Sequence, residues 1–314
     1  MTPLDAWLLL MVIIWGANFT LVKVGIAAMP AQAFNAGRLG VAGLVFAVVI
    51  AWGVRMGRRP GPAGGWQTLL RPTPMPWRDW ALVCGLGVVG HVLYQLCFIQ
   101  GLPRTTAANS SLILACSPVF VAFLSAAAGH ERIRPQHWAG VALSVGGMYL
   151  VAGRDVTWSS ESARGDLIML VASILWAAYT VGSRPFVERY SPLLVTGYGM
   201  IFGALLYLAL VFPTMVATDW SAIGWTTWLA MVASGVLALN LAYVIWYVAV
   251  QRLGSARTSV WSNFTPIVAM AVGVAWIGER VDAMKILGAA AILAGVALTR
   301  LGGGRVPDVE PLSE

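Results

Sequence analysis

Polar and aromatic residues that could bind a small solute occur at helical spacing within one apolar stretch. His91, Tyr94 and Gln95 follow Gly87 at intervals close to whole helical turns, and Phe98 continues the same face. A polar stripe is unfavourable against lipid, so we expect this face to point into the protein interior. It would line a cavity or form a hydrogen-bonded cluster between helices. If a side chain here couples protons, His91 has the ordinary pKa nearest to neutrality.

Similar residues recur on five other apolar stretches. Amides and hydroxyls can bind ammonium and carboxylate groups, while Trp and Tyr rings bind an apolar or aromatic body, including through cation–π contacts. A cavity with this mixture would suit a neutral amphipathic amino acid, and plain packing between helices is the alternative. The sets are Trp15 with Asn18, Asn109 with Ser110 and Ser111, Trp176 with Tyr179, Asn240 with Tyr243 and Tyr247, and Trp261 with Ser262 and Asn263.

Charged residues are scarce inside the apolar stretches. All 13 acidic residues lie away from their middles. Intramembrane carboxylates are the usual proton or sodium relays and the usual counter-ions for cations, so their placement argues against proton-driven export of cationic compounds. It favours a neutral, zwitterionic or anionic solute. Lys23 and Arg38 lie within the stretches and would snorkel to the interface or pair with carbonyls, or else contact a substrate carboxylate.

The sequence gives no set of residues for catalysis, a cofactor or a metal. Cys84, Cys97 and Cys116 lie in apolar stretches without a CxxC pair. Ser234–Gly235 lacks the preceding glycine of a nucleophile turn, and His91 would be the one histidine available to it. A membrane enzyme and a non-transporting receptor are the rival classes. We expect no nucleic-acid partner, because no basic run is interleaved with aromatics outside the apolar stretches, and no obligate protein partner.

These residues are carried by a chain of 314 residues that is 59% hydrophobic and 11% charged. Soluble domains carry about 25% charged residues, so this composition predicts an integral membrane protein in a lipid bilayer. Each apolar run must be helical, because lipid offers no partner for free backbone amides. The predicted fold class is all-α with ten transmembrane helices, near 5–28, 32–53, 80–100, 107–128, 137–152, 166–183, 192–212, 226–249, 257–277 and 284–301.

The two halves of the chain resemble each other. Pro118 and Pro266 are separated by 148 residues, and the same offset pairs Gly140 with Gly288 and the Glu-Arg pair at 131–132 with that at 279–280. We read the Glu-Arg pairs as topology determinants at helix ends. Residues 1–153 and 163–301 are therefore predicted to be two five-helix repeats, the second inverted in the membrane because five is odd. Each proline would break one helical hydrogen bond and act as a hinge or a fixed kink.

The distribution of basic residues predicts the orientation. With the N-terminus in the cytoplasm, 13 Lys and Arg residues fall in inner segments and five in outer ones. Short cytoplasmic loops carry such an excess, so both termini are predicted to be cytoplasmic. The segment 54–79 would be a cytoplasmic loop, and 302–314 a disordered cytoplasmic tail.

The Trp-Gly-Ala-Asn sequence at 15–18, Arg38 and the twin Pro…Glu-Arg…Gly stretches resemble the EamA-type transporters of the drug/metabolite transporter superfamily. The resemblance spans nearly the whole chain. Its length, short termini and aromatic-rich helices look most like the YddG-type aromatic amino-acid exporters of bacterial inner membranes. It implies a carrier that alternates between inward- and outward-open states and exports neutral aromatic or large aliphatic amino acids. The second half departs from the pattern, because no Arg matches Arg38 and Ala177–Ala178 replaces Gly16–Ala17.

Two other kinds of transport stay open. Broad drug or metabolite efflux would use the same aromatic lining. Exchange of nucleotide sugars would need several buried Arg or Lys residues for the diphosphate, and this chain supplies at most two.

Overall fold

The computed structural model describes residues 3–57, 74–105, 107–130, 135–152, 160–278 and 282–301. Every regular element within these ranges is a helix, which confirms the all-helical class. Seven helical segments are long and apolar enough to cross a membrane: Pro3–Ala28, Ala31–Arg55, Trp77–Arg104, Ala163–Arg189, Pro192–Leu210, Trp225–Leu253 and Ser255–Trp276. Shorter apolar helices at Ser117–Ala127, Trp138–Gly147 and Ile286–Gly295 occupy the other predicted spans. The count of ten spans therefore stays a prediction.

The elements follow one another in a similar order in the two halves. The first half contains α1 (Pro3–Ala28), α2 (Ala31–Gly57), α4 (Trp77–Gly87), η1 (Val88–Leu93), α5 (Tyr94–Gly101), η2 (Leu102–Arg104), α6 (Ala107–Leu114), α7 (Ser117–Ala127) and α8 (Pro135–Ala152). The second half contains α9 (Ser160–Arg189), α10 (Pro192–Leu210), α11 (Phe212–Ala217), η3 (Trp220–Ala222), α12 (Trp225–Ala233), η4 (Ser234–Leu241), α13 (Ala242–Leu253), α14 (Ser255–Ser259), η5 (Val260–Phe264), α15 (Thr265–Ile277) and α16 (Ala283–Leu301).

Two irregular helices occupy matching places in the halves. The third predicted span of each half contains a π-helical segment, η1 in the first half and η4 in the second. Such segments widen a helix by one residue and occur frequently at functional sites. A two-repeat architecture fits this correspondence.

The fourth predicted span of each half is interrupted just before its proline. In the first half, α6 ends at Leu114 and α7 begins at Ser117, with Pro118 in its first turn. In the second half, α14 and the 3₁₀ segment η5 precede α15, with Pro266 in its first turn. A proline in the first turn lacks an N–H that has no helical partner there anyway. The regular α-helical pattern therefore changes just before each proline, through a turn in the first half and a 3₁₀ segment in the second, and the role of the prolines as hinges or fixed kinks stays a prediction.

Outward-facing apolar side chains cover the helices where lipid would lie. Leu44, Leu205 and Phe212 are 66%, 63% and 62% exposed. Soluble monomers rarely expose large contiguous apolar surfaces, so this surface agrees with a membrane protein. Trp77 and Trp225 begin helices and are 75% and 73% exposed, as expected of side chains at a membrane–water interface.

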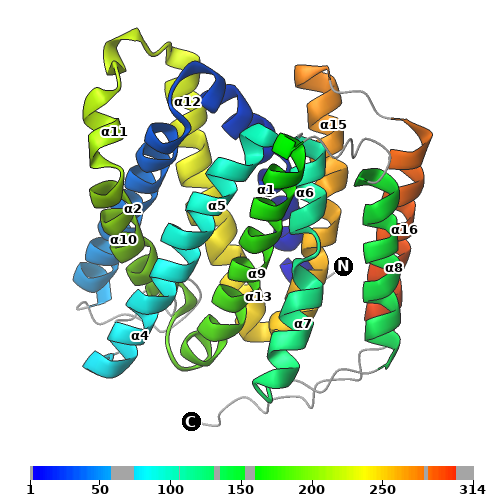
Figure 1. Ribbon diagram of the computed structural model, residues 1–314. Helices are drawn as coiled ribbons and strands as arrows, with labels where there is room; N and C mark the ends of the chain where they lie inside the picture. The colour runs from blue at the N-terminus through cyan, green and yellow to red at the C-terminus, as the bar shows by residue number, and fades with distance from the viewer. Residues whose placement is uncertain are drawn as a thin grey trace.

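Helices α8 and α16 pack side by side at one edge of the molecule (Figure 1). Gly295 of α16 permits their close approach, since an added Cβ would lie 2.3 Å from Ser144 Oγ and 2.5 Å from the carbonyl oxygen of Gly140. Small residues at such contacts let membrane helices approach closely. Another glycine allows a sharp turn of the chain. Gly254 lies between α13 and α14 and has a φ of 85°, which few other residues adopt.

Several predictions fall on parts of the chain that the structure does not describe. Most of the predicted loop 54–79, the tail 302–314 and both Glu-Arg pairs, at 131–132 and 279–280, lie outside the described residues.

Candidate functional site

A cavity lies between the two halves of the helix bundle. It contains about 610 Å³ of empty space, a volume that includes open solvent at its mouth. Its lining comes from both predicted repeats: Trp15, Asn18, Phe19, Arg38, Tyr94, Gln95, Phe98, Ser111, Leu114, Ala115 and Ser117 from the first, and Trp176, Ala238, Leu239, Tyr243, Ser262 and Thr265 from the second.

Aromatic rings form one side of this cavity. The ring centroids of Trp15 and Trp176 lie 5.5 Å apart in an edge-to-face arrangement, and Tyr94 lies 5.5 Å from Trp176. Tyr243 lies 5.3 Å from Trp176, also edge to face. The indole N–H of Trp15 donates to the carbonyl of Ala238 at 3.1 Å, which fixes this ring across the interface between the halves. Such a wall offers a flat apolar surface with polar edges, suited to an aromatic or large aliphatic body.

A buried guanidinium also lines this cavity. Arg38 of α2 is 2% exposed, and its Nη1 donates to Ser234 Oγ at 3.1 Å while Nη2 donates to Gln95 Oε1 at 3.0 Å. Its Cζ lies 5.5 Å from the ring centroid of Phe98. The Ser234 hydroxyl in turn donates to Asn18 Oδ1 at 2.6 Å. Burial of a charge is unfavourable unless it is well hydrogen-bonded, so these neutral partners are needed to hold Arg38 inside the bundle.

Backbone packing explains how Ser234 reaches Arg38. Ser234 is the first residue of the π-helical segment η4, and Gly235 follows it. A Cβ at position 235 would lie 2.8 Å from the carbonyl oxygen of Arg38, so the two backbones meet there. On the other partner helix, Gln95 lies in the first turn of α5, directly after the π-helical segment η1. Both π-helical segments therefore border the residues that hold the guanidinium.

His91 lies behind the aromatic wall and outside the lining. It is fully buried, its Nε2 is hydrogen-bonded to the Tyr179 hydroxyl oxygen at 2.9 Å, and its ring lies 5.5 Å from that of Tyr243. Gly203 of α10 packs directly on its Cβ, where a side chain at 203 would lie 2.5 Å away. His91 and Tyr179 thus support the cavity wall from outside.

The structure brings together ten of the residues predicted from sequence: Trp15, Asn18, Arg38, Tyr94, Gln95, Phe98, Ser111, Trp176, Tyr243 and Ser262. Arg38 does not extend to the interface, so the snorkelling interpretation is wrong for this residue. Lys23 donates from Nζ to the carbonyl of Thr105 at 2.9 Å, which agrees with the expected pairing with a carbonyl. Both remain predictions as contacts for a substrate carboxylate.

Three further predicted residues make helix contacts away from the lining. Asn240 donates to the carbonyl of Gly235 at 3.0 Å, and Asn263 donates to Ser144 Oγ at 3.5 Å. Trp261 is buried with its ring 5.9 Å from that of Phe264. The side chain of Asn109 lies outside the described part of the structure.

Sequence reasoning missed several residues at this site. Phe19 follows Trp15 by one helical turn, so the spacing could have found it. Ser234 carries no such signal, because a serine beside a glycine is ordinary in an apolar helix. The other lining residues not predicted are small or aliphatic, or lie beside the helix breaks: Leu114, Ala115, Ser117, Ala238, Leu239 and Thr265.

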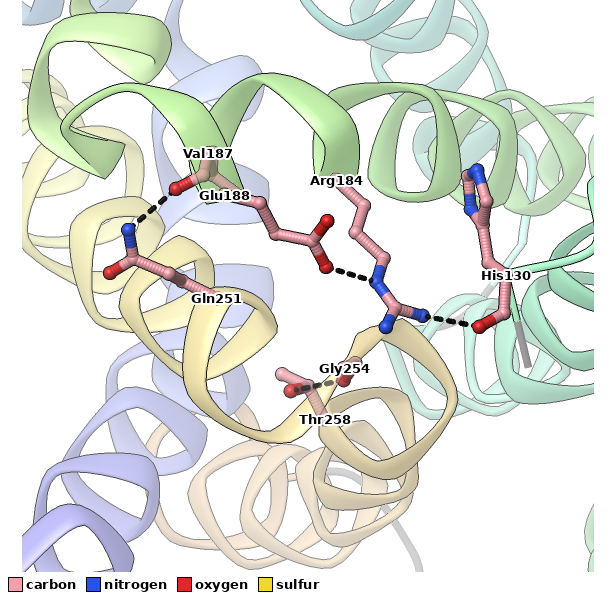
Figure 2. Close-up of polar contacts among 7 residues, drawn as sticks. All are labelled: His130, Arg184, Val187, Glu188, Gln251, Gly254 and Thr258. Carbon is pink, nitrogen blue, oxygen red and sulfur yellow. Dashed lines mark hydrogen bonds and ion pairs between the residues drawn. The ribbon is translucent and has the colours of Figure 1, made fainter. Parts of the chain in front are cut away.

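A second polar cluster joins helix ends away from the cavity lining, as Figure 2 shows. Arg184 of α9 donates from Nε to Glu188 at 2.7 Å and from Nη1 to the carbonyl of His130, which follows α7, at 3.5 Å. Gln251 of α13 donates to the carbonyl of Val187 at 2.5 Å. The end of α9 is therefore tied to both α7 and α13.

The same end of α9 also contacts the start of α4. The Tyr190 hydroxyl donates to Asp79 Oδ2 at 2.6 Å, and this hydrogen bond raises the pKa of Tyr190. Arg189 Nη1 lies 3.8 Å from the same carboxylate oxygen. Four helices thus meet at this end of the bundle.

The sequence profile of the EamA-like transporter family matches residues 2–153 and 163–301. This chain belongs to the EamA-like transporter family. It is accordingly a multi-pass membrane transporter of small molecules and not an enzyme.

Curated relatives of this EamA-like transporter span nearly its whole length. The "Uncharacterized transporter YyaM" of Bacillus subtilis is 25% identical, over 93% of this chain and 91% of the relative. The "Probable terminal-alkyne amino-acid exporter" of Streptantibioticus cattleyicolor is 28% identical, over the same shares. The "Probable amino-acid metabolite efflux pump" of Escherichia coli is 25% identical, over 94% of this chain and 93% of the relative. A solved crystal structure shares the fold with a TM-score of 0.72 at 23% identity, covering 94% of this chain and 98% of that chain.

Proposed function

We propose that this protein exports neutral amino acids with aromatic or large aliphatic side chains across the bacterial inner membrane. The observation that carries the proposal is that one and the same cavity is lined by an aromatic wall and by the buried guanidinium of Arg38. The rings of Trp15, Tyr94 and Trp176 would hold the side chain, and Arg38 with its neutral neighbours would hold the carboxylate. Two relatives whose names refer to amino-acid export or efflux support this choice.

Transport would proceed by alternating access. Substrate sites of inverted-repeat carriers lie near the midplane between the repeats, and residues of both predicted repeats line this cavity. With both termini in the cytoplasm, the predicted topology places the polar cluster of Arg184 and Glu188 at the cytoplasmic end. Its contacts between α7, α9 and α13 would then have to separate when the carrier opens to the cytoplasm (Figure 2).

Counterflow in liposomes tests this proposal. The purified full chain would be reconstituted and supplied in turn with labelled phenylalanine, tryptophan, methionine, threonine, aspartate, lysine and tetraphenylphosphonium, with and without a pH gradient. We expect exchange of phenylalanine, tryptophan and methionine without any gradient, because none of the described lining residues is a carboxylate that could carry protons.

Broad drug efflux is the second candidate, and the aromatic wall favours it. A cationic drug would stack on these rings, but it would lie in the same cavity as the buried charge of Arg38. Exchange of tetraphenylphosphonium alone would replace the amino-acid proposal with this one.

A further inference from the structure

The hydrogen bonds around Arg38 run in one direction. Arg38 donates to Ser234 and to Gln95, and Ser234 donates onward to Asn18. The side-chain amide oxygens of Gln95 and Asn18 therefore already accept bonds from within the protein. A hydroxyl that both accepts and donates, as Ser234 does, has its one donor hydrogen in use.

The unpartnered group of the guanidinium itself is a hydrogen-bond donor. Arg38 Nε is buried and has no hydrogen-bond partner among the described residues, whereas the Gln95 side chain also interacts with the Tyr243 hydroxyl. Arg38 is 2% exposed, Gln95 is 1% exposed, and both side chains line the cavity. A guanidinium carries five N–H donors and no acceptor, so two of them engaged with Ser234 and Gln95 leave others for a ligand. This end of the cavity offers donors to an acceptor such as a carboxylate.

The described lining of the cavity carries positive charge and no negative charge. Among the described lining residues, Arg38 is charged and none is acidic. Asp79, Glu161 and Glu188 form ion pairs with arginines away from the cavity lining. In a site of low dielectric, a single uncompensated charge acts strongly on a bound ion. With its carboxylate paired to Arg38, a zwitterion would leave the occupied cavity with a net positive charge from its ammonium group, whereas a monoanion would leave it with no net charge.

We infer that the preferred solutes of this cavity are aromatic or large apolar monocarboxylates with a net charge of −1. The carboxylate is recognised by Arg38 and Gln95 and the apolar body by the rings of Trp15, Tyr94 and Trp176, while an α-ammonium group is tolerated and not recognised. Free acids and N-acylated amino acids belong to this class. The inference rests on the proposed function for the position of the site. It differs from that proposal in the preferred charge, because it expects anions to bind more tightly than zwitterionic amino acids.

Equilibrium binding to the full chain in lipid nanodiscs separates these possibilities. Four labelled probes share one phenyl body: 3-phenylpropanoate, N-acetyl-phenylalanine, phenylalanine and phenethylamine. We choose binding over flux because the protonated forms of 3-phenylpropanoate and N-acetyl-phenylalanine can cross a lipid bilayer without a carrier. We expect 3-phenylpropanoate and N-acetyl-phenylalanine to bind about threefold or more tightly than phenylalanine, and phenethylamine to bind most weakly. Equal or tighter binding of phenylalanine overturns the inference, as does binding of phenethylamine alone or of none of the four.

The same probes distinguish failure of this inference from failure of the proposed function. Tight binding of 3-phenylpropanoate with no binding or counterflow of phenylalanine would remove amino-acid export and leave the inference standing. Preferential binding and counterflow of phenylalanine would leave amino-acid export standing and overturn the inference.

Variants of Arg38 test whether its guanidinium causes the preference for anions. Arg38→Gln removes the charge, so the affinity for 3-phenylpropanoate should fall by about tenfold or more, with a smaller change for phenylalanine. Arg38→Lys keeps the charge and should keep the order of the four probes, which covers the case that Arg38→Gln fails to fold. Arg164→Gln is the matched control, because Arg164 is 75% exposed beside Glu161. An unchanged preference in a folded Arg38→Gln variant overturns the inference.

Discussion

Arg38 and Ser234, separated by 196 positions in the chain, are joined by a hydrogen bond of 3.1 Å between Nη1 and Oγ. This contact links α2 of the first predicted repeat to η4 of the second. The guanidinium held by this bond lies over the ring of Phe98, with Cζ 5.5 Å from the ring centroid. The Ser234 hydroxyl therefore both joins the two halves and holds the charged group that a solute in the cavity would contact.

Replacing Ser234 with alanine should weaken both the fold and the site. Arg38 and Asn18 would each lose a partner in a buried place, at a cost of about 1–3 kcal/mol. We expect a lower melting temperature and slower counterflow of phenylalanine. Ser221→Ala is the matched control, because Ser221 is exposed and its hydroxyl bonds only to nearby Asp219 in the described contacts. A Ser234→Ala variant with the melting temperature and flux of the wild type would contradict this role.

Removing rings from the aromatic wall should impair transport without preventing membrane insertion. Trp15→Ala, Tyr94→Ala and Trp176→Ala each delete one of the rings that line the cavity. A loss of about 1.4 kcal/mol of binding would weaken affinity about tenfold. Trp276→Ala serves as the control, since its ring is 73% exposed. If all three wall variants transport at the wild-type rate, the assignment of this cavity is wrong.

His91 should not set the pH dependence of transport. It is fully buried behind the wall and is held by Tyr179, so a solute in the cavity does not touch it. We expect His91→Gln to lower the melting temperature while the flux of phenylalanine keeps the same dependence on pH as in the wild type. A flux that requires a pH gradient in the wild type and loses this requirement in His91→Gln would assign proton coupling to His91.

The contact between α8 and α16 should depend on glycine at position 295. A leucine there would collide with Ser144 and the backbone of Gly140, so Gly295→Leu should reduce the melting temperature and the yield of folded protein. Gly146→Ala on α8 is the control, because its added Cβ would meet nothing within 4 Å. Equal stability of the two variants would show that the close approach of these helices is not required.

Helical spacing predicted the faces of the cavity helices well where the helices are regular. Trp15 and Asn18 on α1, and Tyr94 and Gln95 at the start of α5, line the cavity as their spacing indicates. Spacing does not tell which faces of different helices meet, so the contact of Arg38 with Ser234 could not be predicted. That pairing depends on the close approach of two backbones at Gly235.

The prediction failed where the helices depart from regular geometry. Asn240 was grouped with Tyr243, but it lies in the π-helical segment η4 and its amide bonds to Gly235, five residues earlier. Asn263 lies in the 3₁₀ segment η5 and donates to Ser144 instead. Spacing rules for a regular α-helix do not hold in either segment. Apolar composition still predicted the all-helical class, since every span must satisfy its own backbone in lipid.

A structure of the full chain with 4-iodophenylalanine bound would test the central claim most directly, because the iodine can be located by its anomalous scattering. We predict an iodine peak against the rings of Trp15, Tyr94 and Trp176, with the carboxylate within about 3 Å of Arg38 or Gln95. An iodine peak outside this cavity, or a carboxylate turned away from Arg38, would contradict the account.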